Sequence, residues 1–129
     1  MKELDEVTPY FLVQCACEFK GITNEELKSS TRKRHLVVAR VLVAYMLLYL
    51  GYGTEFIGSA VNRDHASVTH YKKIIISQMD IMINSEIKNF RIFLLGKDVR
   101  LPTERQFLDA VKRKEKKEYF KTLGIKTFI

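Results

Sequence analysis

The chain has 129 residues, of which 47% are hydrophobic and 29% charged, and its formal net charge is +7. This length fits one domain with an appendage, and the apolar content is sufficient for an ordinary core, which excludes global disorder. Two prolines and six glycines, against many Leu, Ile, Val, Lys and Glu, favour an all-α fold over a β-sandwich.

The first third of the chain is acidic and predicts two helices. Apolar side chains recur at helical spacing between residues 5 and 20, and Gly21 is placed to end that helix. The sequence Thr-Asn-Glu-Glu at 23–26 is a capping box that opens a second, short helix. Cys15 and Cys17 fall on nearly opposite helix faces, so we interpret them as buried, reduced thiols of a cytoplasmic protein. An N-terminus without an apolar segment predicts no signal peptide.

The longest apolar run, residues 36–52, is interrupted by Arg40 and ends at Gly51. It is too short and too charged at one end for a membrane span, so it predicts a central core helix over 34–50. Gly51 and Gly53 break this helix, and we expect Thr54 to cap the next one.

Residues 54–61 predict a short helix, Asn62 a tight turn, and residues 63–73 a longer polar helix. This order is typical of a helix-turn-helix, whose second helix enters a DNA groove. Val68, Tyr71 and Ile75 share one face of that helix and are expected in the core. The other faces carry donors and cations suited to base edges and phosphates, namely Arg63, His65, Ser67, His70, Lys72 and Lys73.

The positive charge is localised. Residues 32–73 contain seven basic and two acidic side chains, whereas residues 1–31 contain three basic and six acidic ones. This distribution favours a nucleic-acid partner more strongly than the net charge does.

The last third predicts two further helices. Residues 58–96 contain no internal Gly or Pro, and we place a helix break between Ser77 and Ser85, where Asp80, Asn84 and Ser85 offer caps. The second helix of this pair then carries an apolar stripe at Ile87, Phe90 and Leu94. Residues 96–102 are interpreted as a linker.

Thr103 and Gln106 are expected to cap a final helix that carries Phe107, Leu108 and Val111. The charged run 112–117 is either a solvated helix face or an extension of the DNA-binding surface. The apolar tail 123–129 is expected to pack on the domain or on a second copy.

The motif at 63–70, Arg-Asp-His-Ala-Ser-Val-Thr-His, resembles the signature near the C-terminus of the bacterial replication initiator DnaA. The basic residues 32–34, the segment 37–40 and the Ile57-Gly58 pair are similar to the basic loop, helix entry and first helix of that domain. The resemblance covers residues 5–95. It implies a Trp-repressor-like helix-turn-helix bundle over 1–96, followed by a basic helical extension over 97–129.

The resemblance also implies roles for individual residues. Asp64 would accept from a cytosine amino group, His65 and Ala66 would face thymine methyls, and Arg32 would enter an A·T-rich minor groove. Asp64 is also a candidate helix cap, and the two roles are compatible. Arg34 and Arg40 would approach phosphates. Arg40 has an alternative, an internal ion pair with Glu26 or Glu55. The expected DNA-binding residues are Arg32, Arg34, Arg40, Arg63, Asp64, His65, Ala66, Ser67, His70, Lys72 and Lys73.

Two departures from the family stand out. Many members carry two glycines where this chain has Asn62, and a basic residue where it has Leu48. No Gly-x-x-x-x-Gly-Lys-Ser/Thr loop and no catalytic constellation occurs, and His65 and His70 do not share a helix face as metal ligands would. We therefore expect double-stranded DNA binding without cofactor, nucleotide, metal or membrane. The alternative is an interaction module, or a transcriptional regulator, whose C-terminal extension binds a protein partner.

Overall fold

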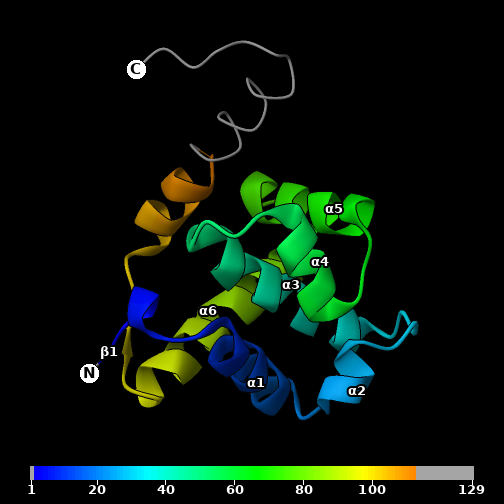
Figure 1. The fold of residues 1–129 in the computed structure, drawn as a ribbon. Helices are drawn as coiled ribbons and strands as arrows, with labels where there is room; N and C mark the ends of the chain where they lie inside the picture. Colours follow the sequence, from blue (N-terminus) through cyan, green and yellow to red (C-terminus); the bar gives the residue numbers. More distant parts are fainter. Residues whose placement is uncertain (1, 113–129) are drawn as a thin grey trace.

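The computed structural model describes residues 2–112, and its centre is helix α3 (Arg34–Tyr49). Figure 1 shows how the other helices surround α3. They are α1 (Pro9–Lys20), α2 (Asn24–Leu27), α4 (Thr54–Val61), α5 (His65–Ser77) and α6 (Ile81–Gly96). Side chains from Val38 to Leu48 of α3 are all buried, which confirms the predicted core helix and the all-α class.

Local signals at the helix ends confirm most of the predicted boundaries. Gly21 ends α1 in the left-handed conformation with φ 66°, and Thr23 and Glu26 form the predicted capping box of α2. Asp80 caps α6 by accepting from the N–H of Ile83 at 3.0 Å, so the break falls where it was expected. The start of α1 was predicted too early, because Thr8 is its N-cap and a separate 3-10 turn, η1, occupies Leu4–Glu6.

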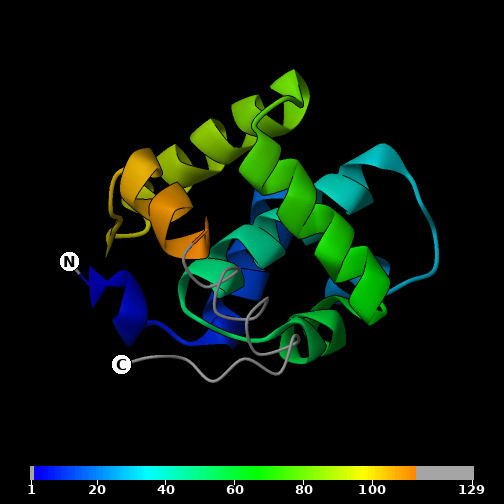
Figure 2. The same ribbon diagram turned by 90° about the horizontal axis from the view of Figure 1, so that it is seen from above.

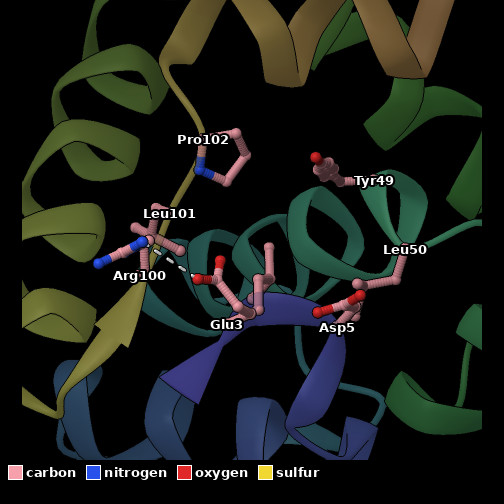
Figure 3. Close-up of a pocket in the computed structure, with 8 residues that line it drawn as sticks. Glu3, Asp5, Tyr49, Leu50, Arg100, Leu101 and Pro102 are labelled. Carbon is pink, nitrogen blue, oxygen red and sulfur yellow. Dashed lines mark ion pairs between the residues drawn. The ribbon is translucent and has the colours of Figure 1, made fainter. Parts of the chain in front are cut away.

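A two-stranded parallel sheet joins the start of the described chain to the segment that follows α6. Strand β1 (Lys2–Glu3) pairs with β2 (Val99–Arg100), inside the segment that was interpreted as a linker. Glu3 and Arg100 form an ion pair at 3.3 Å beside a hollow of about 290 Å³. Figure 3 shows this pair and the residues that line the hollow. Glu3, Asp5 and Arg100 line this hollow, and Arg100 is already paired with Glu3.

Residues 104–112 form a further helix that packs on the core. Thr103 and Gln106 cap it reciprocally, at 3.0 and 3.1 Å, as predicted. Phe107 and Val111 are buried in the main core, so the predicted apolar stripe is largely covered by the domain itself. A domain boundary at residue 96 stays a prediction. Of the run 112–117 only the first residue is described, and the tail 123–129 lies outside the described residues.

Candidate nucleic-acid interface

The turn between α4 and α5 is held by backbone contacts that leave no room for a side chain at Gly58. Asn62 adopts the left-handed conformation with φ 53°, and the N–H of Arg63 donates to the Gly58 carbonyl at 2.8 Å. A Cβ atom at Gly58 would lie 2.5 Å from the carbonyl oxygen of Arg63. The predicted turn at Asn62 is confirmed, and a glycine at 58 lets the two helices approach this closely.

Thr54 has a different role from the predicted one. The N-cap of α4 is Gly53, and no side chain caps this helix end. Thr54 is the first helical residue, and its Oγ1 lies 2.8 Å from Nδ1 of His65, the first residue of α5. This contact fixes the orientation of the His65 ring with either ring tautomer, since a hydroxyl both donates and accepts. His65 stands eleven positions after Thr54 in the chain, and no rule of sequence spacing predicts a contact at that separation.

The start of α5 is capped and exposed. Asp64 is its N-cap and accepts from the N–H of Ser67 at 2.9 Å, which confirms the cap that was predicted as one of its roles. Hydrogen bonding from Ser67 is the largest cause that lowers the pKa of Asp64, and it keeps the carboxylate ionised and able to accept further hydrogen bonds. A carboxylate has lone pairs beyond the one used in the cap, so a second acceptor position is left for a ligand.

One face of α5 is exposed and the opposite one is buried, as predicted. Val68, Tyr71 and Ile75 lie in the core. His65, Ala66, His70 and Lys73 are exposed, and the last three recur at helical spacing along one line. The exposed line combines an apolar methyl, an imidazole and an ammonium group.

The loop between α2 and α3 lies beside this end of α5. Figures 1 and 2 show the loop (cyan) and the start of α5 (green) on the same side of the molecule. Arg32, Lys33 and Arg34 are exposed there, and Arg34 makes a long ion pair with Asp80 at 3.8 Å. An open hollow of about 420 Å³ lies between the loop, α3 and the start of α5. It is lined by Arg32, Val37, Arg40, Arg63, Asp64, Ala66, Ser67, His70 and Tyr71.

Arg40 does not make the predicted phosphate contact from the surface, because its side chain is buried (0% exposed). The guanidinium instead donates to carbonyl groups at the end of α2 and in the loop that follows. The distances are 2.8 Å from Nε to Leu27, 2.9 Å from Nη1 to Thr31, 2.9 Å from Nη2 to Ser29 and 3.4 Å from Nη2 to Glu26. The alternative of an internal ion pair is wrong as well, since Arg40 pairs with no carboxylate among the described residues. Burial, followed by the charge of Arg63, lowers the pKa of Arg40, but a guanidinium stays protonated.

Lys72 and Arg63, two other predicted DNA contacts, are also less exposed than expected. Lys72 is buried (5% exposed) on the inner side of α5, which contradicts a phosphate contact by its side chain in this conformation. Arg63 is half-buried, and its guanidinium donates to the carbonyls of Asn62 at 3.0 Å and Thr31 at 3.3 Å. Lys73, one position further along α5 than Lys72, is exposed, because successive helical positions point about 100° apart.

The model of a protein family described as bacterial dnaA protein helix-turn-helix matches residues 11–75. The chain belongs to this DnaA family. The matched segment runs from α1 to α5 and therefore includes the basic loop, the turn and the exposed start of α5. The family is a DNA-binding domain family that serves replication initiation, so the helix-turn-helix is its DNA-binding element. Neither the search of curated proteins nor that of solved structures found a match.

The structure shows what replaces the usual DnaA residues at both departures from the family pattern. Asn62, where many family members have two glycines, uses its side chain to donate to the Lys28 carbonyl at 2.9 Å, a contact that glycine cannot make. Leu48, where the family often has a basic residue, is buried. The shorter turn is thus tied to the basic loop by a side chain.

Other classes of site find little support in the described part of the chain. No three His, Cys, Asp or Glu side chains within residues 2–112 are grouped as metal ligands. No helix in that range is long and apolar enough to cross a membrane. Cys15 and Cys17 are free and buried, and burial raises the pKa of both thiols, which makes them poor nucleophiles.

Removing the hydroxyl of Thr54 tests its contact with His65. We expect Thr54→Val to weaken binding to a preferred duplex by about 0.5–1.5 kcal/mol, the net value of one hydrogen bond, and to leave binding to a scrambled duplex unchanged. Thr69→Val is the matched control, because the Thr69 hydroxyl donates to the backbone carbonyl of His65 and not to its ring. Equal affinities of the two variants, measured by fluorescence anisotropy, would contradict a role for Thr54 in orienting His65.

Proposed function

We propose that this protein binds double-stranded DNA at a short A·T-rich site similar to a DnaA box, with α5 in the major groove and the basic loop at the minor groove. The observation that supports this most is the shared location of the two elements. Arg32 from the loop and Asp64, Ala66 and His70 from α5 line the same open hollow. A duplex that packs against this surface would meet both elements together.

The residues divide into two groups by chemistry. Asp64, His65 and Ala66 stand at the exposed start of α5, where side chains reach base edges in a helix-turn-helix. Arg32 is an exposed guanidinium on a loop, suited to the negative potential of a narrow A·T-rich minor groove. Lys33, Arg34 and Lys73 are exposed cations. They attract the phosphates of any duplex, whatever its base sequence.

We further propose that the 129-residue chain acts without nucleotide, by occupying its sites in replication initiation or in the regulation of that process. No phosphate-binding loop occurs in the sequence. The alternative function is a module that binds proteins through its C-terminal extension, by the apolar stripe at residues 107, 108 and 111 and the tail 123–129. The stripe supports it weakly, because Phe107 and Val111 are buried in the core, and the tail lies outside the described residues. Calorimetric titration with ATP should show no stoichiometric binding.

Comparing His65→Ala with Lys73→Ala separates base recognition from phosphate attraction. Loss of a base contact should reduce the ratio of specific to scrambled affinity by about 1–3 kcal/mol and leave the salt dependence nearly unchanged. Loss of a phosphate contact should weaken binding to both duplexes and reduce the slope of log K against log salt by about one unit. Affinities for a duplex with a DnaA box and for a scrambled duplex of equal composition would be measured across a salt series.

Glu55→Gln is a suitable control in the same experiment, because Glu55 is exposed on α4 and lies outside the hollow. It should leave the ratio of affinities unchanged. An unchanged ratio for His65→Ala, on a duplex that the wild-type protein prefers, would show that α5 does not recognise the bases. A wild-type protein without any preference for the box would refute the proposed site class.

A further inference from the structure

The buried guanidinium of Arg40 contacts the loop that carries Arg32. Its donors reach carbonyls from Leu27 to Thr31, which stand immediately before Arg32 in the chain. The loop has no helical or strand hydrogen bonds of its own between Ser30 and Lys33. Its conformation therefore depends on side chains from elsewhere in the fold.

The helix-turn-helix contacts the same loop. The Thr31 carbonyl accepts from Arg40 at 2.9 Å and from Arg63 at 3.3 Å, so the residue next to Arg32 is bonded to two arginines. Asn62, in the turn before α5, donates to the Lys28 carbonyl at 2.9 Å. Side chains from α3 and from the turn thus bind the carbonyls of residues 28, 29 and 31 in one loop.

We propose that Arg40 is a positioning residue, which holds the loop against the helix-turn-helix so that Arg32 and the start of α5 engage one DNA site as a unit. The proposal rests on the proposed function for its DNA readout. The physical reason is entropic, since a loop held in its bound conformation loses less conformational freedom when DNA binds. Arg40 suits this role because its planar fork directs several donors in fixed directions, which the single ammonium of lysine does not.

The test uses base pairs that separate the two grooves. Replacing an A·T pair by G·C changes both grooves, because guanine adds an amino group in the minor groove. An inosine·C pair presents nearly the major-groove face of G·C but lacks that amino group. The ratio of affinities for inosine·C and G·C duplexes, taken at each position of the box, therefore reports minor-groove recognition alone. We expect the wild-type protein to prefer inosine·C by about tenfold at the position that Arg32 contacts, the size of one base-pair preference.

Three variants then test the role of Arg40. Arg32→Ala should bring that ratio close to one. Arg40→Lys should lower it by a factor of about three or more, although Arg32 is still present, and should leave the preference that depends on His65 within about twofold. The double variant should be no worse than Arg32→Ala, because a positioning residue has no effect on a side chain that is absent. A merely structural role would lower the affinity for every duplex in proportion and keep the ratio at its wild-type value.

Asn62→Gly provides a second variant if Arg40→Lys does not fold. Glycine fits the left-handed conformation at this position, and the change removes one bond to the loop without exposing a buried charge. It should lower the same ratio. Additive losses in the double variant, or a wild-type ratio in both Arg40→Lys and Asn62→Gly, would overturn the proposal.

Hydrogen–deuterium exchange of the free protein tests the positioning role of Arg40 separately from the proposed DNA binding. Arg40→Lys, or Asn62→Gly if the lysine variant does not fold, should speed exchange relative to α1 at the amides of residues 28, 29 and 33, which donate to the Asn24 and Glu26 carbonyls and to the Thr31 hydroxyl. The Gly96→Ala variant, changed at the far end of α6 where no atom lies within 4 Å of the added Cβ, should not. This result does not depend on any DNA preference. Unchanged exchange at these three amides would refute the positioning role even if the protein binds no box.

Discussion

Phe107→Ala is expected to lower the free energy of unfolding by about 3–5 kcal/mol, the cost of removing a large buried aromatic side chain. The ring is fully buried, and its centroid lies 4.3 Å from that of Tyr45 and 4.1 Å from that of Tyr49. Arg91 also lies over the ring, at 5.5 Å from its centroid. Because both tyrosines belong to α3, the loss would be felt at the centre of the bundle. Urea denaturation followed by circular dichroism measures it.

Ile92→Ala is the control for this experiment, because Ile92 is a large apolar side chain with 66% of its surface exposed. Its effect should stay within about 0.5 kcal/mol, as for most surface substitutions. A loss below about 1 kcal/mol for Phe107→Ala would mean that residues 104–112 are not part of the cooperative fold, in agreement with an independent extension after residue 96.

Gly58→Ala should have the second-largest effect, because it acts on stability and on DNA binding together. The added Cβ would lie 2.5 Å from the backbone oxygen of Arg63, and neither atom belongs to a flexible side chain. The α4–α5 turn must therefore shift, at a cost of up to about 3 kcal/mol. A displaced start of α5 moves Asp64 and His65 away from the loop, so the preference for a box duplex should fall by at least about tenfold.

Gly96→Ala is the matched control for Gly58→Ala. It makes the same chemical change in a helix where no atom lies within 4 Å of the new Cβ, so it should be neutral or stabilise by about 0.4–1 kcal/mol. Thermal unfolding gives the stability of both variants, and fluorescence anisotropy gives their affinities for box and scrambled duplexes. A Gly58→Ala variant with the wild-type melting temperature would show that the turn adapts without strain.

The sequence alone determined the α-helices and most of their ends. Capping at Thr23, Asp64 and Asp80 depends on hydrogen bonds over three residues, and a spacing of three is visible in the sequence. The buried face of α5 follows from helical periodicity in the same way, and so does the turn at Asn62. Membership of the DnaA family was predicted from motifs inside the segment that the family model matches. All of these signals are local.

The tertiary structure decided which side chains are exposed and what they contact. An arginine in an apolar run predicts an unusual environment for Arg40. Its partners, however, are backbone carbonyls at the end of α2 and in the loop that follows, and these come close only because α2 packs on α3. Thr54 meets His65, and β1 meets β2, because the helices between them fold back. Backbone carbonyls occur at every residue and leave no trace in the sequence. An interaction that uses them across a fold can therefore be recognised only in three dimensions.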